Sequence, residues 1–251
     1  MGGVGLAIAF FVTALLYASV GFGGGSTYTA LLTLGGVGYT ILPVISLLCN
    51  VVVVTGGSIR FARAGQVDWR RVIPLVLVSA PLAWLGGLTP ISQQSFTLLL
   101  AASLLVAGLL LLFQSEHSDL RAPGAPRAVW FDLIAGGGAG YLAGLVGIGG
   151  GIFLAPVLHL TRWGSARAIA ATASIFILVN SVAGLAGQFM KLGTSGAVTS
   201  LTPYWPLAIA VLIGGQIGSL ASVRLLPQAL VRRLTGVLIL YVAGQLFWKM
   251  V

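Results

Sequence analysis

Two glycine clusters hold the residues whose spacing is best suited to binding a ligand. VGFGGGSTYTALL begins at Val20, and VGIGGGIFLAPVL begins at Val146. An apolar run follows each cluster, so we expect the last glycines to stand at the start of a helix, where the first N–H groups lack helical acceptors. Such N–H groups and the positive end of the helix dipole attract anions, and glycine allows close approach. The predicted ligand-binding glycines are Gly23, Gly24, Gly25, Gly149, Gly150 and Gly151.

Two asparagines are expected at the depth of the glycine clusters. Asn50 follows Val20 by 30 residues, and Asn180 follows Val146 by 34. At 1.5 Å per helical residue they lie about 14 and 17 Å into their apolar segments. An amide enclosed by apolar residues needs hydrogen-bond partners, which a ligand can supply. The remaining predicted binding residues are Ser26, Gln188 and Gln216.

Glycines and asparagines in apolar helices also have a purely structural use. Small residues allow close helix packing, and an asparagine can hydrogen-bond across a helix pair. We assign the packing use to Gly214 with Gly218. For the two clusters, the same pattern occurs twice at matching depth, and polar groups in apolar surroundings are costly. This repetition favours a ligand site.

The glycine clusters belong to an internal duplication. Gly21 and Gly147 are 126 residues apart (147 minus 21), and Asn50 and Asn180 are 130 residues apart (180 minus 50). The chain is therefore expected to be a tandem of two related units, which is a common construction in transporters. The predicted parts are an N-terminal repeat, 1–113, a cytoplasmic linker, 114–129, and a C-terminal repeat, 130–251.

The composition excludes a soluble globular domain. Of 251 residues, 58% are hydrophobic and 7% are charged, whereas soluble domains have about 25% charged residues. We therefore expect an all-α polytopic membrane protein. The formal net charge of +9 does not indicate nucleic-acid binding, because the basic residues occur singly or in pairs between apolar runs. Cys49, the single cysteine, excludes an internal disulfide.

Ten apolar segments are bounded by glycine, proline or charged residues. Segments 26–35 and 151–160 have ten residues each, and so reach about 15 Å, half of a ~30 Å hydrocarbon core. We expect each to be a half-helix that turns back within the bilayer after its glycine cluster. Whether either one crosses fully is left open. The other segments predict about eight main helices, at 4–20, 40–61, 71–88, 94–113, 130–146, 168–190, 204–223 and 234–250.

The basic residues decide between two arrangements of the repeats. If the half-helices are re-entrant, the repeats are inverted, and eleven arginines face the cytoplasm while Lys191 and Lys249 lie outside. If each repeat instead crosses four times, the count is eight against five. Because basic residues concentrate on the cytoplasmic side, we expect inverted repeats, each a re-entrant hairpin plus three transmembrane helices, with both termini outside. The eleven are Arg60, Arg63, Arg70, Arg71, Arg121, Arg127, Arg162, Arg167, Arg224, Arg232 and Arg233.

Acidic and catalytic groups are expected away from the membrane centre. Asp68, Glu116 and Asp119 fall in predicted loops, and Asp132 lies near the start of a segment. No carboxylate is then placed to carry a proton or bind sodium at mid-membrane, and the membrane potential is the simplest energy source for anion export. Ser26 has no predicted base nearby, and the sequence holds neither G-x-S-x-G nor H-E-x-x-H. We therefore expect no enzyme activity, no metal and no cofactor.

The paired motif resembles that of the TauE/SafE sulfite exporter family (TSUP). Two VGxGGG motifs, each followed by an asparagine-bearing helix in a basic chain of about 250 residues, carry this resemblance over 4–113 and 130–250. It implies a multi-pass protein of the bacterial inner membrane that exports sulfite, sulfoacetate or other small sulfur-containing anions. It also implicates the clustered glycines and both asparagines. Ile152 and Phe153 stand in the second motif where the first has Ser26 and Thr27, so an asymmetric site is expected.

The resemblance leaves the substrate, the direction of transport and the coupling ion open. An anion channel with the same repeats and a transporter of another small organic anion are the nearest alternatives. A membrane-embedded hydrolase and a purely structural subunit are more distant ones. The expected partners are a small anion and the lipid bilayer, with a homodimer left open and no nucleic acid.

Overall fold

The structure, a computed structural model, describes residues 3–19, 21–113, 129–160, 163–193, 201–221 and 228–250. Within these ranges the chain forms α-helices and one 3-10 turn. The helices are α1 (Gly3–Ser19), α2 (Gly25–Leu34), α3 (Leu42–Arg63), α4 (Trp69–Leu88), α5 (Gln93–Phe113), α6 (Val129–Val146), α7 (Gly151–Leu160), α8 (Ala166–Leu192), α10 (Trp205–Ala221) and α11 (Gln228–Met250). The 3-10 turn is η1 (Thr202–Tyr204).

Some residues used in the topology prediction lie outside the described part. These are Glu116, Asp119, Arg121, Arg127, Arg162 and Arg224. The side chains of Asp132, Arg232 and Lys249 also lie outside it.

Each of the ten predicted segments corresponds to one α-helix of the described chain, with bounds that differ by a few residues. The start of α11 differs most, because this helix begins at Gln228 rather than at 234. The prediction takes the pair Arg232 and Arg233 as a boundary. Arginine has high helix propensity, so the helix extends beyond its apolar run.

In the described part of the chain, five helices are long and apolar enough to cross a membrane. Large apolar side chains on their outer faces are exposed, for example Leu77 at 69% and Leu220 at 63%, which suits contact with lipid. The chain is therefore a polytopic helical membrane protein. The five spans are Leu42–Arg63, Trp69–Leu88, Gln93–Leu112, Arg167–Leu192 and Thr202–Leu220.

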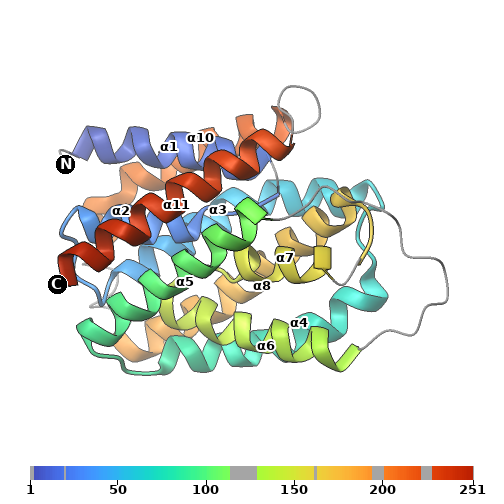
Figure 1. Ribbon diagram of the computed structural model, residues 1–251, viewed down its shortest axis with the longest axis horizontal. Helices are drawn as coiled ribbons and strands as arrows, with labels where there is room; N and C mark the ends of the chain where they lie inside the picture. The colour runs from blue at the N-terminus through green and yellow to red at the C-terminus, as the bar shows by residue number, and fades with distance from the viewer. Residues whose placement is uncertain are drawn as a thin grey trace.

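The helices form a bundle with α3 and α8 in contact with each other (Figure 1). On one side of the bundle α1 packs along α10, and on the other α6 packs along α4. α10 also lies against α3, and α4 lies against α8. Each outer pair therefore joins a helix from the first half of the chain to one from the second half. α1 begins and α11 ends at the same end of the bundle, on the left of Figure 1.

Glycines bring the outer helix pairs into backbone contact. A Cβ atom at Gly214 or Gly218 of α10 would collide with the carbonyl oxygens of Phe11 and Leu15 of α1. A Cβ atom at Gly144 of α6 would likewise collide with a carbonyl oxygen of α4. Small residues are what allow membrane helices to approach this closely. The packing use predicted for Gly214 with Gly218 is confirmed.

The short helices α2 and α7 follow sharp reversals of the chain. Each has ten residues and spans about 15 Å. Gly21 has φ +84° and follows the end of α1, and Gly147 has φ +83° and follows the end of α6. A residue after a helix often adopts this left-handed conformation, which glycine tolerates best. The glycine clusters therefore stop one helix before the next begins.

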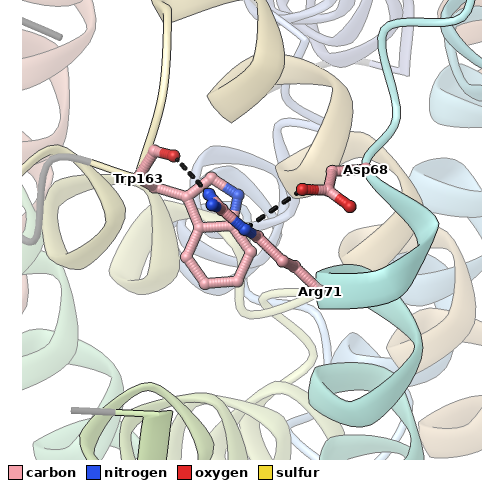
Figure 2. Close-up of polar contacts among 3 residues, drawn as sticks. All are labelled: Asp68, Arg71 and Trp163. Carbon is pink, nitrogen blue, oxygen red and sulfur yellow. Dashed lines mark hydrogen bonds and ion pairs between the residues drawn. The ribbon is translucent and has the colours of Figure 1, made fainter. Parts of the chain in front are cut away.

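Polar contacts join the loops at the two ends of the bundle. Arg71, near the start of α4, pairs with Asp68 at 3.1 Å and donates a hydrogen bond to the Trp163 carbonyl at 2.9 Å (Figure 2). Lys191 near the end of α8 donates to the Thr89 carbonyl just after α4, at 3.4 Å. The α3–α4 loop therefore lies beside the α7–α8 loop, and the ends of α4 and α8 lie together.

Candidate functional site

The two glycine loops, residues 21–24 and 147–150, meet inside the bundle. A Cβ atom at Gly25 would lie 2.7 Å from the Ile148 carbonyl oxygen, which leaves no room for a side chain between the loops. The Ser46 hydroxyl of α3 lies 2.8 Å from the Gly25 carbonyl oxygen and 2.7 Å from the Gly147 carbonyl oxygen. α3 therefore links the start of one half-helix to the loop before the other.

The side chain of Asn50 lies between these loops. A Cβ atom at Gly149 would be 2.6 Å from Asn50 Nδ2, and a Cβ atom at Gly23 or Gly25 would also collide with the Asn50 amide. Asn50 is 0% exposed. Neither its Oδ1 nor its Nδ2 has a hydrogen-bond partner among the described residues. A buried amide without partners costs roughly 1–3 kcal/mol per group, a cost that a hydrogen-bonding ligand would remove.

The first turns of α2 and α7 contribute free donors beside this amide. Among the described residues, no hydrogen bond engages the backbone N–H groups of Gly25, Ser26 or Thr27. The same holds for Gly151 and Ile152 at the start of α7. Both helices direct the positive end of their dipoles toward the loops. The site combines backbone donors with one amide, a set that is suited to an oxyanion.

The sequence is similar to known membrane transporters along nearly its whole length. Residues 6–246 match the model of the family described as Sulfite exporter TauE/SafE. The chain belongs to this family. It is 34% identical to "Probable membrane transporter protein y4hK" of Sinorhizobium fredii over 247 residues, 98% of each chain. It is 24% identical to "Probable membrane transporter protein MJ0441" of Methanocaldococcus jannaschii over 186 residues, 71% of this chain and 68% of that one. No solved structure matches significantly.

The family assignment agrees with the glycine motifs that first indicated it. The chain is a multi-pass membrane transporter of the TauE/SafE type, a family of transporters rather than enzymes. The glycine loops lie inside the matched region, at residues 21–24 and 147–150.

Asn180 and Gln188, two predicted site residues of this TauE/SafE transporter, have surroundings that differ from those of Asn50. Asn180 is 0% exposed, but its Nδ2 donates to the Phe176 carbonyl of its own helix at 2.9 Å, and its Oδ1 has no partner among the described residues. Gln188 donates to the Gly144 carbonyl at 2.8 Å, where α8 contacts α6. Asn50 therefore lies at the junction of the loops, whereas the hydrogen bond of Asn180 is made within its own helix.

Ser26 and the predicted glycines lie at the loops, whereas Gln216 lies away from them. Ser26 is buried in the first turn of α2. Gly24 packs against the Tyr28 ring, with a Cβ position 2.9 Å from Tyr28 Cζ, and Gly150 packs against Phe176. Gln216 of α10 lies against Gly56 of α3, six residues and about 9 Å along the helix from Asn50.

Three residues at the junction are absent from the predicted set, Ser46, Ile177 and Ser181. The buried Ser181 hydroxyl oxygen lies 3.2 Å from the Gly149 Cβ position and has no hydrogen-bond partner among the described residues. Ser46, which bonds the loops, lies four residues before Asn50 and therefore on the same face of α3, a spacing that could have identified it. Ile177 of α8 faces Gly23, Gly149 and Gly151. It is one apolar residue among many in its segment, and nothing in its spacing distinguishes it.

Proposed function

We propose that this transporter carries small sulfur-containing anions, such as sulfite, sulfoacetate and other organosulfonates, out of the cell across the bacterial cytoplasmic membrane. The observation that carries the proposal is the Asn50 amide, which is fully buried, has no hydrogen-bond partner in the described part of the chain, and contacts both glycine loops. An oxyanion there would accept a hydrogen bond from Asn50 Nδ2 and from the free N–H groups at the starts of α2 and α7.

The size and charge of the site support a small anion. Glycines at 23, 25 and 149 let the Asn50 amide pack directly against the loops, so only a compact head group can reach the backbone donors, and only when Asn50 or the loops move. Asp68 is the one carboxylate whose side chain the structure describes, and it is 46% exposed and paired with Arg71. Sulfite and sulfonate groups carry three oxygens, which several converging donors can bind at once.

We further propose that the two halves are inverted repeats, with α2 and α7 as re-entrant half-helices. Two contacts support this arrangement, since they join segments that would lie on opposite membrane faces if the repeats were parallel. The first joins Arg71 to Trp163 and the second joins Lys191 to Thr89. The arrangement keeps the arginine-rich loops on the cytoplasmic side, as basic residues prefer.

A carrier is favoured over an open channel because the junction is closed to both sides. Asn50, Asn180 and Ser181 are each 0% exposed, so an anion can enter or leave only if helices move. The membrane potential can drive the export, since it supplies about 2.3 kcal/mol per charge per 100 mV. For a monovalent anion this corresponds to roughly fifty-fold accumulation outside.

Thermal unfolding of the purified protein with a panel of anions tests the proposal. A ligand that binds only the folded state raises the melting temperature, and the increase grows with its concentration relative to Kd. We expect sulfite and sulfonates to raise the melting temperature more than carboxylates of similar size. In proteoliposomes, saturable flux would support a carrier, and unsaturated flux a channel. If no anion in the panel changes the melting temperature, the proposal is wrong.

A further inference from the structure

Arg60 forms a second polar cluster, between α3 and α10. Its Nη1 and Nη2 groups both donate to Gln216 Oε1 at 3.2 Å, and Nη2 also donates to the Ser219 hydroxyl. A Cβ atom at Gly56 would lie 2.6 Å from Gln216 Nε2 and 3.1 Å from Arg60 Nη2, so glycine makes room for the cluster. We call Arg60, Gln216 and Ser219 the Arg60 cluster.

The Arg60 guanidinium has only neutral partners among the described residues. It is partly buried, and its Nε atom is buried with no hydrogen-bond partner in the described part of the chain. Arg71 differs, because it is 48% exposed and pairs with Asp68. A partly desolvated cation without a counter-ion is costly inside a membrane protein. An oxyanion that replaced Ser219 would remove this cost, because Nε and Nη2 lie on one side of the guanidinium and could then donate to two of its oxygens.

The position of Arg60 relates the cluster to the site between the glycine loops. Arg60 is ten residues beyond Asn50 on α3 and three residues before the helix ends at Arg63, so it lies about 15 Å from Asn50 along the axis. In the proposed orientation this end of α3 faces the cytoplasm. Arg60 therefore lies between the cytoplasm and the central site.

We infer that the Arg60 cluster is a second anion site, which loads the sulfur-containing anion from the cytoplasm before it reaches Asn50. The inference rests on the proposed function and adds a second binding step to it. The cluster attracts the anion by the charge of Arg60 and binds it through Nε–H and Nη2 in exchange for the Ser219 hydroxyl, since Nε is buried while Ser219 is in place. Gln216 holds the guanidinium in place during the exchange.

Sulfite uptake into inside-out proteoliposomes tests the inference, with Arg60→Gln, Arg60→Lys and a matched control. Arg63→Gln removes the same charge from the same end of α3, at an exposed position. We expect Arg60→Gln to raise the KM for sulfite about tenfold, the loss of one charge-assisted interaction, with Vmax within about twofold of wild type. Arg60→Lys should recover part of the loss, and Arg63→Gln should behave like wild type.

The same assay with Asn50→Leu separates failure of this inference from failure of the proposed function. A wild-type KM in Arg60→Gln, together with lost uptake in Asn50→Leu, overturns the loading site and leaves the central site intact. A fall in Vmax of Arg60→Gln without a change in KM means that Arg60 only joins α3 to α10, which also overturns the loading site. Wild-type uptake in Asn50→Leu, or no sulfite uptake by the wild type, overturns the central site and the loading site together.

Discussion

Replacing Asn50 with leucine should stabilise the empty protein and abolish anion binding. The amide of Asn50 is fully buried, and both of its polar atoms lack partners among the described residues. Leucine has a similar size and no polar atom, so it fits between the glycine loops without the cost of an unpartnered amide. Residues that destabilise the empty state are expected at binding sites, where the ligand supplies the missing interactions.

The size of the effect follows from the two unpartnered atoms. Each costs roughly 1–3 kcal/mol of folding free energy when it is buried without a partner. Removing both atoms therefore stabilises the folded protein, and imperfect packing of leucine offsets part of this stabilisation, so the net increase in the free energy of unfolding is about 2 kcal/mol. For a chain of this length, 1 kcal/mol corresponds to about 2–4 °C in melting temperature. We therefore expect the empty Asn50→Leu protein to melt about 4–8 °C above the wild type, with no further increase on adding sulfite.

The assay is thermal unfolding in detergent, with and without sulfite, and Asn180→Leu is the matched control. Asn180 loses a real hydrogen bond to Phe176 as well as one unpartnered acceptor, so its melting temperature should change little. A lower melting temperature for empty Asn50→Leu would mean that the Asn50 amide is already satisfied in the empty protein. A sulfite response that survives the substitution would refute its role in binding.

Three further predictions concern the scaffold. Gly144→Ala should lower the melting temperature by several degrees, because the added Cβ atom would collide with a carbonyl oxygen of α4. Gly138→Ala is the control and should leave the melting temperature unchanged, because no atom lies within 4 Å of its Cβ position. Equal effects of the two substitutions would contradict the packing of α6 against α4. Ser46→Ala should cost about 1–2 kcal/mol of stability, seen as a lower melting temperature, since it removes the hydroxyl between the glycine loops; an unchanged value would show that this link is dispensable. Cysteines at the exposed positions Arg63 and Arg233 should react with an impermeant reagent from the same membrane face, and labelling from opposite faces would exclude inverted repeats.

The positions of the helices could be predicted from the sequence because each depends on local features. Apolar runs bounded by glycine, proline and charge gave all ten α-helices of the described chain. Gly21 and Gly147 lie where the chain leaves one helix and turns toward the next. Both adopt the left-handed backbone conformation that glycine tolerates best, so glycine in the sequence is a local sign of such a turn. The start of α11 was missed because charge alone does not end a helix.

The arrangement of side chains at the loop junction could not be predicted in the same way. The duplication treats Asn50 and Asn180 as equivalent, yet Asn180 bonds to its own helix while Asn50 contacts both glycine loops. Asn50 meets the second glycine loop 99 residues away in the chain (149 minus 50), at Gly149. Gln216 was predicted for the central site, and its contact with Arg60 joins residues 156 positions apart. No local pattern encodes such a contact.

A crystal structure of the protein with selenite, a sulfite analogue whose selenium scatters anomalously, tests the central site most directly. We expect an anomalous peak between the two glycine loops, within hydrogen-bond distance of Asn50 Nδ2 and of the first N–H groups of α2 and α7. A fully occupied selenite elsewhere, with the space beside Asn50 empty, would contradict it.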